Sequence, residues 1–147
     1  MSKKIAIGAD HAGFEEKEKL KSTLTELGIE FEDMGTTSTE SVDYPDFALK
    51  VGRAVASGEA EQGLLVCGSG TGMAIAANKV HGVRAAVAWS PDIARLAREH
   101  NNANVLSLPA RFIDEAQAKE ILKAWFDAKF QGGRHEKRVE KINEADS

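Results

Sequence analysis

The segment Cys67-Gly68-Ser69-Gly70-Thr71-Gly72 carries the clearest chemical signal in the sequence. It follows residues 63–67, the most apolar run of the chain, and it precedes a segment of small residues typical of a helix. Glycines allow backbone amides to approach a ligand closely, and amides at the start of a helix stabilise anions. The segment therefore predicts an anion site, for a phosphate or for an oxyanion that develops during a reaction. A tight strand-to-helix turn that binds nothing is the plainer alternative.

Cys67 is the only cysteine, which excludes an intrachain disulfide and a metal site built from several cysteines. A thiol that faces the start of a helix can have a lowered pKa, which would make it a usable base or nucleophile. A free cysteine can equally be a small buried hydrophobic residue. A redox role, with reversible oxidation of the thiol, is a third possibility.

Histidines stand at two places suited to acid–base chemistry near neutral pH. His11 follows Asp10 directly after the first apolar run, and His100 lies near the end of a predicted helix, before Asn101. For His100 the alternative is a histidine that only complements the helix dipole.

Arg134 and Arg138 are four residues apart, on one face of a predicted final helix, with His135 beside them. Two guanidinium groups on one face suit a phosphate monoester. A solvated basic face is the alternative.

The common nucleotide-binding motifs are incomplete. Met73 stands where a dinucleotide fingerprint starting at Gly68 needs glycine, and Phe14 stands where a Walker loop starting at Gly8 needs lysine. A nicotinamide-dependent enzyme or a kinase is therefore disfavoured.

Short apolar runs alternate with helix-period segments along the whole chain, which predicts an α/β fold with a five-stranded parallel sheet. We expect a strand order of 2-1-3-4-5, with the ends of the first and third strands side by side at the switch point. Asp10, His11 and Cys67 would then meet there. We find no repeat or linker, and expect one domain over residues 1–147. The predicted strands are residues 5–7, 29–34, 63–67, 83–89 and 104–108, and the predicted helices follow Gly13, Pro45 and Ser90 or cover about 74–78, 114–130 and 134–143, with 36–43 as a polar loop.

The composition of the 147 residues is that of a globular protein, with 42% hydrophobic and 29% charged residues. The formal net charge of -4 disfavours a general nucleic-acid binder. No apolar run approaches the roughly 18 residues of a membrane span, and the first apolar run is broken by Gly8 and Asp10, too early for a signal peptide. We expect a cytoplasmic protein without membrane or nucleic-acid partners.

Together these motifs resemble the type B ribose-5-phosphate isomerases, the family that includes allose-6-phosphate and galactose-6-phosphate isomerases. The matching segments occur in the same order along nearly the whole chain. They are Ile7–Gly13, Asp43–Pro45, Cys67–Gly72, Ala76–Lys79, His100–Val105 and Gly132–His135.

The resemblance implies a Rossmann-like three-layer sandwich, with helices on both faces of the sheet and a helical C-terminal extension. It implies an aldose–ketose isomerase without metal or cofactor, which interconverts ribose 5-phosphate and ribulose 5-phosphate through an enediolate. It also implies a homodimer, or a dimer of dimers, with sites between subunits. A six-carbon sugar phosphate as substrate, or a non-catalytic module that binds a sugar phosphate or nucleotide, are the alternatives.

By resemblance, Cys67 is the base that moves the proton between C1 and C2, and His100 opens the sugar ring. Ser69 is placed with these catalytic residues. The enediolate is held by the loop that contains Gly68, Gly70, Thr71 and Gly72. Sugar hydroxyls or the ring oxygen are contacted by Asp10, His11, Tyr44 and Asn101, and the phosphate by Arg111, Arg134 and Arg138, with His135 nearby. One departure is Pro109, where family members often have glycine, and this change can move Arg111.

Overall fold

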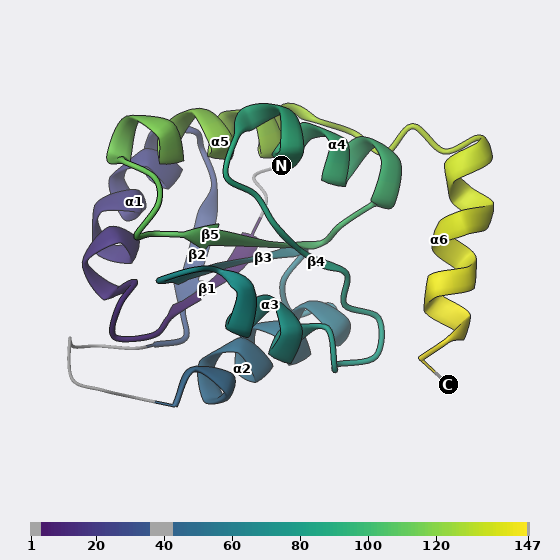
Figure 1. Cartoon of the computed structure of the whole chain (residues 1–147), viewed down its shortest axis with the longest axis horizontal. Helices are drawn as coiled ribbons and strands as arrows, with labels where there is room; N and C mark the ends of the chain where they lie inside the picture. The colour runs from purple at the N-terminus through teal and green to yellow at the C-terminus, as the bar shows by residue number, and fades with distance from the viewer. Residues whose placement is uncertain (1–3, 36–42, 147) are drawn as a thin grey trace.

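The computed structural model describes residues 4–35 and 43–146, so most of the predicted polar loop at 36–43 lies outside the described residues. The chain forms three layers, a parallel sheet with helices on both faces, as the sequence predicted (Figure 1). The strands are β1 (Lys4–Ala9), β2 (Glu30–Asp33), β3 (Gln62–Cys67), β4 (Ala85–Val87) and β5 (Val105–Pro109). The helices are α1 (Phe14–Glu26), α2 (Tyr44–Ala56), α3 (Thr71–Ala77), α4 (Pro91–Asn101), α5 (Glu115–Asp127) and α6 (Arg134–Glu144).

The strand order is β2-β1-β3-β5-β4, so the predicted order of the last two strands is wrong. β5 lies between β3 and β4, and all its residues are buried, including Leu106 and Leu108. Burial on both faces suits an interior strand. β4 has only three residues, each half-buried, and it forms the edge. The other half of the prediction is confirmed, because β1 and β3 are neighbours and β2 is the opposite edge.

The corrected order also determines which face each helix covers. Parallel crossovers are right-handed, so reversing the direction from β4 to β5 moves α4 to the opposite face of the sheet. α4 accordingly packs with α5, and α5 with α1, whereas α2 and α3 pack together on the other face (Figure 1).

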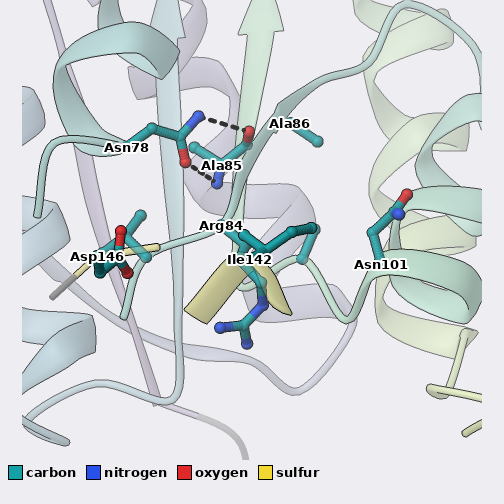
Figure 2. Close-up of a pocket in the computed structure, with 9 residues that line it drawn as sticks. Asn78, Arg84, Ala85, Ala86, Asn101, Ile142 and Asp146 are labelled. Carbon is teal, nitrogen blue, oxygen red and sulfur yellow. Dashed lines mark hydrogen bonds between the residues drawn. The ribbon is translucent and has the colours of Figure 1, made fainter. Parts of the chain in front are cut away.

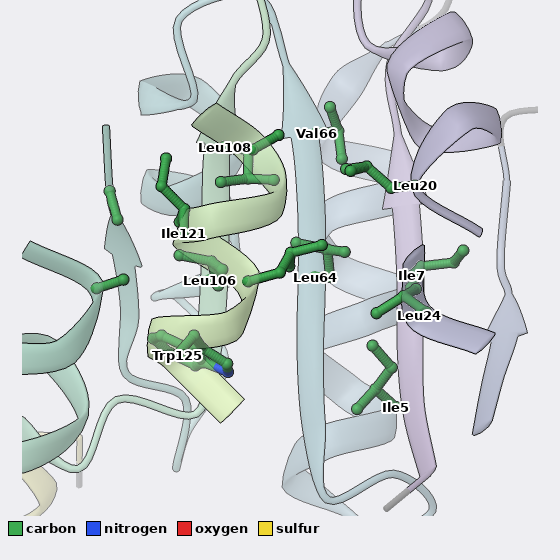
Figure 3. Close-up of a cluster of buried hydrophobic side chains, with 14 of the residues drawn as sticks. Ile5, Ile7, Leu20, Leu24, Leu64, Val66, Leu106, Leu108, Ile121 and Trp125 are labelled. Atoms are coloured by element: carbon green, nitrogen blue, oxygen red, sulfur yellow. The ribbon is translucent and has the colours of Figure 1, made fainter. Parts of the chain in front are cut away.

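Each face of the sheet has its own hydrophobic core. Leu64, Val66, Leu106 and Leu108 point toward α1 and α5, where they meet Trp125 (Figure 3). The alternate residues of the strands point toward α2 and α3, and Cys67 is one of them. The thiol therefore belongs to the α2–α3 side of the molecule, because successive residues of a strand face opposite ways.

Two of the predicted elements, residues 83–89 and 114–130, are longer than the observed strand and helix, for local reasons. β4 begins only at Ala85, because side chains take up the backbone amides before it. The Arg84 amide donates to the Asn104 side chain at 2.7 Å, and the Ala85 amide donates to the Asn78 side chain at 2.7 Å. Helix α5 begins at a capping box on Asp114 but ends at Asp127. The chain after it is extended, and the Gln131 amide donates to the Glu99 carbonyl oxygen, 3.0 Å away.

Candidate functional site

Cys67 is the last residue of the central strand β3, and its side chain is buried. The backbone amide of Gly70 points at the thiol, with 3.1 Å between its nitrogen and Sγ. An amide that donates to sulfur stabilises the thiolate form. The structure thus places the predicted base directly against the predicted anion-binding loop.

Burial nevertheless raises the pKa of the Cys67 thiol above its usual value of 9.0, and the carboxylate of Asp10 raises it further. Backbone amides of Met73, Gly70 and Ser69 act in the opposite direction, without prevailing. The expectation of a lowered pKa at the start of a helix is therefore wrong for this chain, because desolvation of a charged sulfur outweighs the amides. The Cys67 thiolate is therefore a strong base, but only a small fraction of the thiol is ionised at neutral pH.

The glycine loop is held in shape by the neighbouring strand. Gly70 has a φ of 78°, which a residue without a side chain adopts at little cost. The Ser107 hydroxyl on β5 donates to the Gly70 carbonyl oxygen at 2.6 Å. The Thr71 amide donates to the Ser69 hydroxyl, 3.3 Å away, while the Ser69 side chain remains exposed. The loop thus presents Ser69 to solvent at the start of α3.

The turn after β1 is fitted tightly onto β3. The Asp10 amide donates to the Val66 carbonyl oxygen at 3.3 Å, and the Asp10 carboxylate accepts the Gly13 amide at 2.9 Å. A Cβ atom on Gly13 would lie 2.0 Å from the Val66 carbonyl oxygen, so only glycine fits there. His11, half-buried, is part of the same turn. This packing places Asp10 close enough to Cys67 for its carboxylate to act on the thiol, as predicted for the switch point, and His11 lies in the same turn.

Arg111 and Tyr44 close over the glycine loop from two other elements. A Cβ atom on Gly68 would lie 3.1 Å from Nε and Cζ of Arg111, so the guanidinium group lies directly over that glycine. The Arg111 amide donates to the Gly68 carbonyl oxygen at 3.0 Å, despite Pro109 two residues before it. Tyr44 similarly lies over Gly72, 2.8 Å from such a Cβ to the ring.

A second group of predicted residues gathers where α4 ends and α6 begins. The imidazole rings of His100 and His135 are stacked, with centroids 4.3 Å apart and planes 12° from parallel. His135 is buried, whereas Asn101, Arg134 and Arg138 are exposed. Arg134 and Arg138 line a basic hollow of about 520 Å³ with Gly133, Lys137 and Lys141.

The two groups lie at opposite ends of the strands. His100 precedes β5, whose first residue Val105 pairs with Gly63 at the start of β3, while Cys67 ends β3. Gly63 and Cys67 are about 13 Å apart at roughly 3.3 Å per residue. Within one chain, His100 and Cys67 therefore do not share a site.

Two arginines that the sequence reasoning missed hold the chain that follows His100. Asn102, at a φ of 45°, is the C-cap of α4, and its side chain and the Ala103 carbonyl oxygen accept hydrogen bonds from Arg98 at 3.1 and 2.6 Å. Arg84 donates to the Asn102 carbonyl oxygen at 2.9 Å and to the Asn143 side chain of α6 at 3.0 Å. Burial lowers the pKa of both guanidinium groups. The sequence does not indicate these structural roles of Arg84 and Arg98, because both residues are spaced like ordinary surface arginines.

Arg84 and Asn101 also line a cavity of about 340 Å³ under α6 (Figure 2). A smaller hollow of about 310 Å³ borders the glycine loop, with Ser69 and Thr71 on one side and the exposed aromatic rings of Trp89 and Phe112 on the other. Residues 4–35 and 43–146 contain no cluster of three or more histidine, cysteine or acidic side chains able to hold a metal ion. Among these same residues, no helix is long and apolar enough to cross a membrane.

Comparison with known proteins identifies the family. A family model described as Ribose/Galactose Isomerase matches residues 5–142. The chain belongs to this family. The ribose-5-phosphate isomerase B of Escherichia coli K12 is 49% identical over 140 residues, which are 95% of this chain and 94% of that protein.

A solved structure and a further relative are also similar to this chain over nearly its whole length. The solved structure of a ribose 5-phosphate isomerase from Thermotoga maritima is 55% identical, covers 98% of this chain and 99% of its own, and superposes with a TM-score of 0.94. A D-erythrulose-4-phosphate isomerase from Pectobacterium atrosepticum is 44% identical over 94% of this chain and 91% of its own length.

Membership of the ribose/galactose isomerase family confirms the predicted resemblance and makes the chain an isomerase. This finding sets aside the two hypotheses in which the protein is not an isomerase, the non-catalytic binding module and the redox thiol protein.

Proposed function

We propose that this chain interconverts ribose 5-phosphate and ribulose 5-phosphate by proton transfer through an enediolate. One observation carries the proposal. The only thiol of the chain ends the central strand with the Gly70 amide 3.1 Å from its sulfur, and the guanidinium group of Arg111 lies over the adjoining Gly68. A base beside an anion-stabilising loop is what abstraction of a proton next to a carbonyl requires.

In the proposed reaction, the Cys67 thiolate takes the proton from C2 of the open-chain aldose and returns it to C1. Backbone amides of Gly68, Gly70, Thr71 and Gly72 hold the negative charge that develops on the sugar oxygens. Ser69, exposed on the same loop, exchanges protons with these oxygens. Asp10, His11 and Tyr44 orient the sugar from the surrounding turns. No metal or cofactor enters this scheme.

The reaction also needs a residue that opens the sugar ring, a role that we assign to His100. Because His100 and Cys67 lie at opposite ends of one sheet, we propose that a second copy of the chain supplies His100 and Asn101 to each Cys67. The exposed Arg134 and Arg138 would arrive with them and bind the phosphate together with Arg111. The active unit is then a homodimer, alone or within a dimer of dimers.

A substrate panel tests the reaction. Ribose 5-phosphate, allose 6-phosphate, galactose 6-phosphate and D-erythrulose 4-phosphate are assayed at matched concentrations, with Cys67→Ala as the matched control. The proposal expects the highest kcat/KM with ribose 5-phosphate and nearly none in the variant. A preference for a six-carbon or four-carbon sugar phosphate would contradict the proposed substrate but not the proposed mechanism. Full activity of Cys67→Ala would contradict the mechanism.

Mixing two inactive variants tests the shared site. Cys67→Ala and His100→Asn are unfolded together, refolded and assayed. A two-fold dimer with composite sites regains about one quarter of the wild-type activity, because half of the dimers are mixed and each has one intact site. Sites confined to single chains would regain nothing.

A further inference from the structure

The stacked pair of His100 and His135 is a contact built by two helices. His135 is only 7% exposed, and its ring lies parallel to the His100 ring with centroids 4.3 Å apart. The two helices are fixed to each other independently of the rings. The Gln131 amide, just before α6, donates to the Glu99 carbonyl oxygen on α4, and Arg84 donates to Asn143 near the end of α6. Helix α6, which carries His135, is therefore held in place near both of its ends.

We propose that His135 is a positioning residue for His100. Its buried ring stacks on the His100 imidazole and fixes the plane in which His100 exchanges protons with the sugar ring. This inference rests on the proposed function, in which His100 opens the ring. It gives His135 a role that differs from contact with the phosphate, which a buried side chain reaches poorly.

A histidine in the last turn of a helix needs such support. A general acid or base acts only when its nitrogen lies about 2.6–3.2 Å from the atom that receives or loses the proton. An imidazole ring rotates readily about its own side-chain bonds unless something packs against its face. A displacement of about 1 Å can lower a catalysed rate about 100-fold. The neighbouring ring supplies the packing surface.

Charge favours a neutral His135 in this position. Burial lowers the pKa of the His135 imidazole, and the positive charges of His100, Arg134 and Arg138 lower it further. On α4, the nearby Glu99 carboxylate is occupied by Arg95 at 2.8 Å, so it does not offset these cations. Two imidazolium rings face to face would repel each other, whereas a neutral His135 stacks on His100 in either protonation state of the latter.

Two assays separate ring opening from the later proton transfer. Ribose 5-phosphate is mainly a cyclic hemiacetal and must be opened, so its turnover depends on His100. Ribulose 5-phosphate cannot form a five-membered ring because its C5 oxygen carries the phosphate. Exchange of its C1 proton with solvent deuterium therefore needs Cys67 but no ring opening. Both rates are measured for His135→Ala and His135→Phe, with His81→Ala, an exposed histidine in a turn, as the matched control.

We expect His135→Ala to lower kcat for ribose 5-phosphate by about 10- to 100-fold, while exchange at C1 of ribulose 5-phosphate stays within about twofold. His135→Phe keeps a flat ring without a titratable nitrogen, and should restore turnover to within about threefold of wild type. His81→Ala should change neither rate.

Three results would overturn the inference: equal losses in both assays with a lowered Tm, weaker inhibition by inorganic phosphate in both variants with kcat unchanged, or no change at all. The first indicates a purely structural role and the second indicates phosphate contact. His100→Asn in the same assays tests the proposed function separately. The ¹H–¹³C signals of the His100 imidazole report on the stack without any activity, and signals that are identical in wild type and His135→Ala would refute it.

Discussion

The Ser107 hydroxyl donates a hydrogen bond of 2.6 Å to the carbonyl oxygen of Gly70, and both residues are buried. This bond joins the interior strand β5 to the glycine loop that follows β3. The same glycine donates its amide to the sulfur of Cys67, so Gly70 is bonded to both β5 and β3. The sheet itself therefore determines where the anion-binding amides point.

Ser107→Ala should destabilise the protein by about 0.5–1.5 kcal/mol, because the buried Gly70 carbonyl oxygen loses one of its two donors and keeps the Ala74 amide at 3.3 Å. It should also lower kcat, since the loop amides are no longer held against the sulfur of Cys67. Urea unfolding and a ribose 5-phosphate assay measure the two effects. Ser57→Ala, which removes a hydroxyl that donates to the Ala54 carbonyl oxygen in the last turn of α2, is the control. Native stability and native kcat in Ser107→Ala would show that the bond does not matter.

Alkylation of Cys67 should be slow at pH 7 and rise steeply toward and beyond pH 9, because burial raises the pKa of the thiol above 9.0 and only the thiolate reacts. Mass spectrometry after iodoacetamide treatment follows the reaction, and the single cysteine makes the added mass unambiguous. Ribose 5-phosphate should protect the thiol. A thiol already fully reactive at pH 6 would contradict the raised pKa.

Cys67→Ala should lower the isomerisation rate by about 10²–10⁴-fold, the usual contribution of a positioned base, while the fold is retained. The residue is small and stands at a strand end, so little packing is lost. The measurement is kcat alongside the circular dichroism spectrum. Near-normal kcat would exclude Cys67 from proton transfer.

Arg134→Gln and Arg138→Gln should each weaken binding of phosphorylated sugars and of inorganic phosphate. A charge-assisted hydrogen bond contributes about 1.5–3 kcal/mol, which corresponds to about 10- to 100-fold in affinity. Phosphate inhibition and substrate saturation are measured on each variant. Arg95→Gln, an exposed arginine on α4 paired with Glu99, is the matched control and should change neither. Unchanged phosphate inhibition in both variants would leave Arg111 as the main phosphate ligand.

The free energy of unfolding should fall as the pH drops below about 6.5, partly through His135. Its pKa in the folded protein is lowered from 6.5, so the unfolded chain binds the proton more readily than the folded chain. Stability is therefore lost as the pH falls through this range. His135→Phe should show a smaller loss than wild type in urea unfolding at pH 7.5 and 5.5, and His81→Ala should not. Identical losses in wild type and His135→Phe would contradict the lowered pKa.

Local features were predictable because their causes are local. The cap of α4 at Ser90 follows from a serine placed before proline, and the side chain does accept the Ile93 amide at 3.3 Å. The central position of β3 follows from a run of buried apolar residues, and its neighbour β1 from the α/β pattern. Cys67, Asp10 and the glycine loop were found because strand ends at a switch point are where ligands bind.

The sequence alone determined the α/β class, the isomerase family and the residues at the carboxyl ends of β1 and β3, since these depend on short motifs and on the periodicity of apolar residues. Only the tertiary structure decided that β5 lies between β3 and β4. Several strand orders suit the same sequence pattern, and the order is selected by how well the two faces of each strand are buried. That order moves α4, and with it His100, to the face of α1 and α5, and the structure stacks His100 against His135. The pKa of Cys67 was likewise beyond the sequence, because the balance between desolvation and amide dipoles depends on how deeply the folded chain buries the sulfur.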